Sequence, residues 1–250
     1  MKVRLIQAHP EPSSFNGSLS RRAIEALEGQ GNDVSFRDLV SDGFDPVEAR
    51  QRYPDRLNPE RFAPLAEQRH AWKTGNLPED VAEEIEELER ADLLILQFPL
   101  WWHGPPAIMK GWFDRVFLSG GLYTSRKRYN TGHFLGKRAL ISITTGAPGT
   151  AFGPGARGGD FGVMLWPVHY SLHYMGFSVL PPFISYGVQG HGYTYEDQGS
   201  LGRRLGALLD EWARYLERLE TVAPLVFPGW ADWDDDGRAL MPGKESHAQQ

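Results

Sequence analysis

The 250-residue chain contains no cysteine, and this absence excludes several kinds of chemistry. Disulfide bonds, thiol catalysis, iron–sulfur clusters and cysteine-based zinc sites all require it. No apolar run approaches the roughly 20 residues that a membrane-spanning helix needs. The first segment, MKVRLIQAHPEP, has prolines too early for the apolar region of a secretory signal. We therefore expect a soluble, cytoplasmic protein without membrane insertion.

An excess of basic residues is also missing. The chain has 26 Lys and Arg against 32 Asp and Glu, a formal net charge of −6. Proteins that bind nucleic acid generally present a basic surface, which replaces the counterions of the phosphates. The charge balance therefore argues against nucleic acid as a partner. The composition, with 41% hydrophobic and 23% charged residues, is that of an ordinary globular protein.

Apolar, strand-like runs alternate with amphipathic, helix-like segments along the chain. Strands are predicted in VRLIQAHP, DVSFRDL, DLLILQFP, RALISITTG and, more weakly, SVLPPFISY. This alternation predicts an α/β fold with a doubly wound parallel sheet, and five strands favour the flavodoxin-like order 2-1-3-4-5 with helices on both faces. Residues 41–77 are expected to form a partly helical excursion. We assign residues 1–221 to this domain and residues 222–250 to a C-terminal extension with a mobile end.

Ligands of such sheets bind beyond the carboxyl ends of the strands, which selects the loops 9–17, 99–105 and 145–159. The first loop, HPEPSSFNGSLS, brings hydroxyls, an amide and free backbone N–H groups to a predicted helix start, a natural site for an anion. The alternative is simple helix capping by Asn16 or Ser18.

The second loop carries two adjacent tryptophans and a histidine between prolines. Tandem indoles in an irregular segment cannot both point into the core, so Trp101 or Trp102 is expected to line a surface or pocket. An imidazole titrates near neutrality, so His103 is a candidate for a direct proton role or a hydrogen-bonded pocket residue. The third loop holds six glycines between residues 146 and 159. A flavin would suit these three loops; an aromatic core with flexible loops is the alternative.

Four motifs together resemble the NAD(P)H:quinone oxidoreductases of the DT-diaphorase type, in the flavodoxin-2 superfamily. They are AHPEPSSFNGSL, ADLLILQFPLWWHGPPAIMKGWFDRVF, ISITTG and DFGVMLWPVHYSLHYMGF, and the similarity runs from residue 1 to about 227. The resemblance implies a homodimer with a flavin at each subunit interface. It also implies ping-pong transfer of two electrons from NAD(P)H, through the flavin, to a quinone that binds in the same place.

The resemblance further implies where the flavin lies. FAD is favoured over FMN because the chain has the long form's excursion and C-terminal extension. Tyr123 matches a tyrosine that borders the acceptor pocket from the partner subunit. The positions that match flavin contacts are His9, Ser14, Phe15 and Asn16 on the diphosphate and ribityl side, Leu100, Trp101, Trp102 and His103 at the ring edge, and Thr144, Thr145, Gly146 and Ala147 beneath the ring.

The chain departs from the family pattern beside the flavin. The family's tyrosine and histidine there fall on Phe152 and Gly158, so Phe152 is expected to border the substrate. A reduced flavin still needs a nearby donor or positive charge. Arg157 is the first candidate because its charge is permanent, and His103 is the second. Acceptor preference therefore cannot be carried over from the family.

Other assignments stay open at this stage. A regulatory flavoprotein, such as an ancillary subunit of a potassium efflux system, or a reductase of azo or nitro compounds are alternative functions. His169 and His173 have a spacing that suits a helical metal site, but without an evident third ligand we interpret them as packing or surface residues. The basic cluster of residues 126–128 is either a solvated loop or an attractor for the 2′-phosphate of NADPH or an anionic acceptor. An arginine near the adenine end is expected at Arg203 or Arg204.

Overall fold

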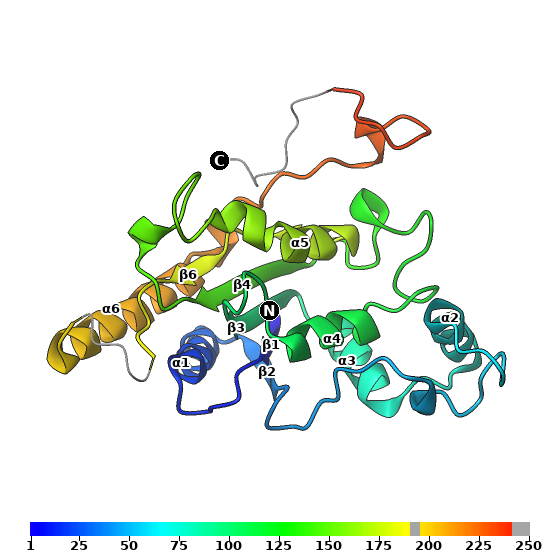
Figure 1. The fold of residues 1–250 in the computed structure, drawn as a ribbon, viewed down its shortest axis with the longest axis horizontal. Helices are drawn as coiled ribbons and strands as arrows, with labels where there is room; N and C mark the ends of the chain where they lie inside the picture. Colours follow the sequence, from blue (N-terminus) through cyan, green and yellow to red (C-terminus); the bar gives the residue numbers. More distant parts are fainter. Residues whose placement is uncertain (191–195, 242–250) are drawn as a thin grey trace.

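The computed structural model describes residues 1–190 and 196–241, and its centre is a parallel sheet with helices on both faces (Figure 1). The strand order is β2-β1-β3-β4-β5, which confirms the predicted flavodoxin-like order. Every residue of β3 is buried, as expected for a central strand covered on both sides. The first four strands are β1 (Lys2–Gln7), β2 (Asp33–Asp38), β3 (Leu93–Pro99) and β4 (Arg138–Thr144).

The fifth position in the sheet is filled by two short strands. Both β5 (Ser178–Val179) and β6 (Phe183–Ser185) pair with β4 in parallel. Pro181 and Pro182 lie between them and have no backbone N–H to donate to a ladder. The weak fifth strand predicted from the sequence is therefore interrupted, at an edge of the sheet where an interruption is tolerated.

The helices divide into two groups that cover opposite faces. Helices α1 (Phe15–Gly29) and α6 (Gln198–Glu217) share one core, in which Trp212 is fully buried. Helices α3 (Glu79–Arg90), α4 (Ala107–Val116) and α5 (Phe161–Tyr174) build the other. The excursion is partly helical as predicted, and contains α2 (Pro64–Thr74) and the short turn Arg50–Arg52.

Helix α4 is held in place by buried charges. Glu84 on α3 is fully buried, pairs with Arg4 and Arg37, and accepts a hydrogen bond from Trp112 Nε1 at 2.9 Å. Arg115 at the end of α4 donates to Asp80 at 2.6 Å. Buried charges need such partners because removal from water is costly. The network fixes α4 against the sheet, and both ends of α4 border the region described next.

The C-terminal extension lies on the α5 side of the molecule (Figure 1). It includes the turn Trp230–Asp232, and Trp230 Nε1 donates to Arg128 O at 3.1 Å. The predicted mobile end falls largely on residues 242–250, which lie outside the described residues. In the part of the chain that is described, no helix combines the length and the apolar character needed to span a bilayer.

Candidate functional site

The three loops predicted from the sequence meet at the carboxyl ends of β1, β3 and β4. Leu100 N donates to Thr144 O at 2.8 Å, which joins the second loop to the third. The rings of His9 and Trp101 have centroids 6.2 Å apart, which brings the first loop against the second. The residues predicted to surround a flavin therefore lie around one edge of the sheet.

A buried amide network connects the elements that carry these loops. Asn16 on α1 donates through Nδ2 to Thr144 Oγ1 at 3.0 Å, and Gln97 on β3 donates through Nε2 to Asn16 Oδ1 at 2.9 Å. The side chain of Asn16 is therefore used inside the protein. Gln97 was not predicted from the sequence, because a single polar residue in an apolar strand carries no positional signal of its own.

The residue that caps the start of α1 is not one of the two predicted from the sequence. The N-cap is Ser14, whose Oγ accepts from Gly17 N at 3.2 Å, so capping by Asn16 or Ser18 was wrong. Within the described residues, the N–H groups of Phe15 and Asn16 donate to no other group. They lie at the positive end of the helix dipole, where an anion is stabilised. Phosphate binding, the other predicted alternative, stays a prediction.

Gly17 allows the first loop to fold back over this helix start. A Cβ atom at position 17 would lie 2.1 Å from the carbonyl oxygen of Pro12, which is far inside van der Waals contact. Any larger residue would push residues 9–14 away from the helix. This glycine therefore allows the first loop to lie directly against the start of α1.

The tryptophan–histidine segment forms a tight two-residue hairpin. Trp101 and Gly104 exchange both backbone hydrogen bonds, at 3.0 and 3.1 Å. Between them Trp102 has φ 49° and His103 has φ 63°, the left-handed values of a type I′ turn, which asparagine and glycine usually occupy. Backbone strain in such residues is typical of functional sites. Trp101 is 45% exposed, Trp102 is 96% exposed and His103 is exposed, so this apolar surface is presented outward as predicted.

The third loop contains small residues directly after β4 and an aromatic residue, Phe152, further along. Thr144 and Thr145 are buried, and Gly146 is exposed beside them. Phe152 packs against Phe161 with ring centroids 4.5 Å apart, so it is partly buried. Arg157 is exposed, and makes no hydrogen bond or ion pair with the residues described here.

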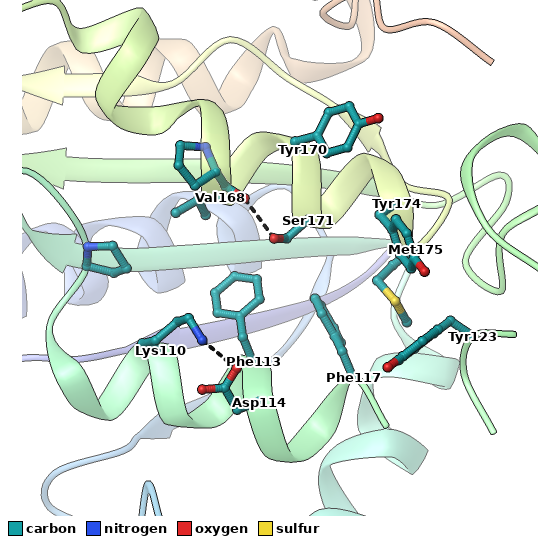
Figure 2. Close-up of a pocket in the computed structure, with 12 residues that line it drawn as sticks. Lys110, Phe113, Asp114, Phe117, Tyr123, Val168, Tyr170, Ser171, Tyr174 and Met175 are labelled. Atoms are coloured by element: carbon teal, nitrogen blue, oxygen red, sulfur yellow. Dashed lines mark hydrogen bonds and ion pairs between the residues drawn. The ribbon is translucent and has the colours of Figure 1, made fainter. Parts of the chain in front are cut away.

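A cavity of about 400 Å³ runs between α4 and α5, from Pro105 beside the hairpin to Tyr123 (Figure 2). Tyr123 meets Tyr174 edge-on, with centroids 5.5 Å apart. Burial raises the pKa of Tyr170 above its ordinary value. The cavity was not predicted as a unit. Its lining residues are Pro105, Lys110, Phe113, Asp114, Phe117, Tyr123, Pro167, Val168, Tyr170, Ser171, Tyr174 and Met175.

The chain is similar to known proteins in both sequence and fold. The family model of the flavodoxin-like fold matches residues 1–204. The chain is 40% identical over 228 residues to NAD(P)H dehydrogenase (quinone) 1 of Cavia porcellus, which covers 90% of this chain and 80% of that protein. It is 38% identical over 232 residues to ribosyldihydronicotinamide dehydrogenase (quinone) of Mus musculus, covering 92% and 96%. The chain belongs to the NAD(P)H quinone dehydrogenase family.

A solved structure supports the same assignment. A quinone reductase from Klebsiella pneumoniae, described there as putative, aligns with a TM-score of 0.81 and 33% identity, over 98% of this chain and 93% of that one. The family assignment predicted from the four motifs is therefore confirmed. The match extends beyond the domain core, because these alignments include most of the excursion and part of the C-terminal extension.

Two further predictions concern residues outside the loops. His173 stacks on Phe227, with centroids 4.8 Å apart, and its Nε2 donates to Pro228 O at 2.9 Å, so it packs against the extension. Arg204 donates to the carbonyls of Tyr186 and Gly187, at 3.0 and 2.7 Å. Arg203 is exposed and donates to Ser200 Oγ at 3.0 Å.

Proposed function

We propose that this protein is a flavin-dependent NAD(P)H:quinone oxidoreductase. The observation that carries the proposal is the family match over nine-tenths of the chain, together with the meeting of the three loops at one sheet edge. When bound, a flavin would supply two-electron chemistry, by which NAD(P)H, a proton and a quinone would become NAD(P)⁺ and a hydroquinone.

Different residues of the chain would bind different parts of the flavin cofactor. The free N–H groups of Phe15 and Asn16, with Ser14, would hold the phosphates of the cofactor. The hairpin of Trp101 and Trp102 would lie at the ring edge, and residues 144–147 beneath the ring. FAD, rather than FMN, is proposed because the chain carries both the long excursion and the C-terminal extension of the family's long form.

The polar pair of the family is replaced, so another group must stabilise negative charge near the ring. Arg157 is exposed in the third loop and carries a permanent charge. We expect Arg157→Ala to slow the reduction of the bound flavin by NAD(P)H roughly tenfold or more, in line with the loss of one charge-stabilising group. Stopped-flow absorbance measures this rate directly. Arg214→Ala, at an exposed position on α6, is the control; an unchanged rate for Arg157→Ala would remove Arg157 from the mechanism.

A homodimer is proposed from the family resemblance, in which each flavin lies at the subunit interface. The hairpin precedes α4 and Tyr123 follows it, and a 10-residue helix is about 15 Å long. The hairpin and Tyr123 therefore lie at opposite ends of α4. Tyr123 would border the flavin of the partner subunit, as in the family pattern.

A single preparation tests the function. The purified protein is denatured to release and identify its flavin, and NADH and NADPH oxidation is then followed with a benzoquinone as acceptor. We expect one FAD per chain and turnover with the quinone. A colourless protein that cannot be reconstituted with FAD or FMN would refute the proposal. A yellow protein with negligible turnover would favour the regulatory alternative, which the loss of the polar pair also suggests.

A further inference from the structure

Arg128 lies inside a cage of aromatic rings. The centre of its guanidinium is 5.8 Å from the Tyr129 ring centroid, 5.4 Å from Tyr174 and 5.3 Å from Trp230. These rings come from the loop after α4, from α5 and from the C-terminal extension. Cation–π contacts of this kind attract the guanidinium without neutralising it.

The positive charge of Arg128 is therefore retained. Its Nε donates to Ser125 O at 3.2 Å, and its Nη1 donates to the hydroxyl of Tyr174 at 3.0 Å. In residues 1–190 and 196–241 it forms no ion pair with a carboxylate. A guanidinium has five N–H donors, so three of them are left after these two bonds.

This charge lies at one end of the cavity between α4 and α5. Tyr174, which accepts from Arg128, lines that cavity and packs edge-on against Tyr123 (Figure 2). The neighbouring basic residues are placed differently. Lys127 donates to Gly121 O at 3.2 Å and contacts His133, and Arg126 is exposed. Of the basic cluster, only Arg128 touches the wall of the cavity.

We propose that Arg128 selects electron acceptors that carry an anionic group, a carboxylate or sulfonate, beside the quinone ring. This inference rests on the proposed function. The aromatic wall suits a flat ring, and the three free donors suit the oxygens of an anion, which guanidinium binds in a fork geometry. The cage fixes the guanidinium in advance, so little side-chain freedom is lost on binding. The charge thus determines which quinones are good substrates.

Two probes with the same ring test this assignment: a naphthoquinone sulfonate and the same naphthoquinone without the sulfonate. The measured quantity is the ratio of their kcat/KM values. We expect Arg128→Met to lower this ratio roughly tenfold, since one charge-assisted contact is lost, with little change for the neutral quinone. Arg126→Met, which changes the charge equally, is expected to leave the ratio unchanged.

The wild-type protein provides a second measurement that does not depend on folding of a variant. Raising the ionic strength is expected to lower kcat/KM for the sulfonate and not for the neutral quinone, because salt screens exposed charges. Equal losses for both quinones in Arg128→Met would show a structural role and overturn the proposal. A changed NADPH-to-NADH preference with an unchanged quinone ratio would overturn it too, because the charge would then recognise the dinucleotide phosphate. If wild-type protein reduces neither quinone, the proposed function itself fails.

Discussion

By the family resemblance, Phe152 and Gly158 fall where a tyrosine and a histidine are expected, and in the structure these two positions lie side by side. A Cβ atom at position 158 would lie 2.8 Å from Ala151 O and 3.0 Å from the Phe152 ring. A side chain at 158 and the phenyl ring at 152 therefore compete for one space. A residue larger than glycine at position 158 would therefore require the loop or the Phe152 ring to move.

His169 gives the protein a defined sensitivity to acid. Burial lowers its pKa to about 4 from an ordinary value of 6.5, and its Nε2 has no partner among the described residues. Between these pH values the unfolded chain binds a proton that the folded chain does not. Because of His169, the free energy of unfolding therefore falls by on the order of 3 kcal/mol as the pH decreases from 6.5 toward 4. Above pH 6.5 the group causes no such loss.

The measurement is urea unfolding at several pH values for wild type and for His169→Leu. Other groups titrate in both proteins, so they cancel in the difference. We expect the variant to lose distinctly less stability than wild type between pH 6.5 and pH 4. Parallel pH dependences in the two proteins would show that His169 is protonated freely in the folded state.

At the scale of the element, the hairpin of Trp101–Gly104 holds two non-glycine residues in left-handed backbone. We expect His103→Gly to raise the free energy of unfolding by roughly 1 kcal/mol, because glycine adopts φ 63° without a Cβ clash. The same change should weaken flavin binding, since the turn becomes less rigid. Denaturant unfolding of the flavin-free protein and flavin titration measure the two effects. Loss of stability would contradict the assignment of strain.

The start of α1 can be tested with a matched pair of glycines. Gly17→Ala places a Cβ against the Pro12 carbonyl, so we expect the first loop to move and flavin affinity to fall at least tenfold, the order of effect that loss of a charge-assisted contact produces. Gly29→Ala is the control at the other end of the same helix, where a Cβ meets nothing within 4 Å. It should leave flavin affinity unchanged. Equal affinity in both variants would separate this loop from the cofactor.

At the scale of the whole molecule, the proposed sharing of sites between subunits predicts complementation. Tyr123→Leu damages the acceptor wall, and Gly17→Ala damages the flavin site. A mixed dimer contains one Tyr123→Leu subunit and one Gly17→Ala subunit. One of its two sites then combines the intact flavin site of the first subunit with the intact Tyr123 of the second. Random co-assembly should then restore roughly a quarter of wild-type quinone reductase activity, because about half of the dimers are mixed. Co-expression with two affinity tags measures it; activity no greater than the sum of the separate variants would place Tyr123 in its own subunit's site.

The sequence alone determined the fold and the general place of the site. Apolar runs such as DLLILQFP and the periodic spacing of Val81, Ile85 and Leu88 depend only on neighbouring residues, so strands and helices could be predicted. The order of parallel strands then directs their carboxyl ends to one edge. Family motifs added predictions for individual loop residues, which stay predictions.

Only the tertiary structure decided which of several chemically similar groups does a given task. Ser14 rather than Asn16 caps α1, because Asn16 is drawn into bonds with Gln97 and Thr144, far away in sequence. Likewise, Arg128 is distinguished from its basic neighbours by Trp230, which lies about a hundred positions later in the chain. Local propensities for these residues are nearly equal. The choice is made by long-range contacts that exist only once the sheet, α5 and the extension have packed together.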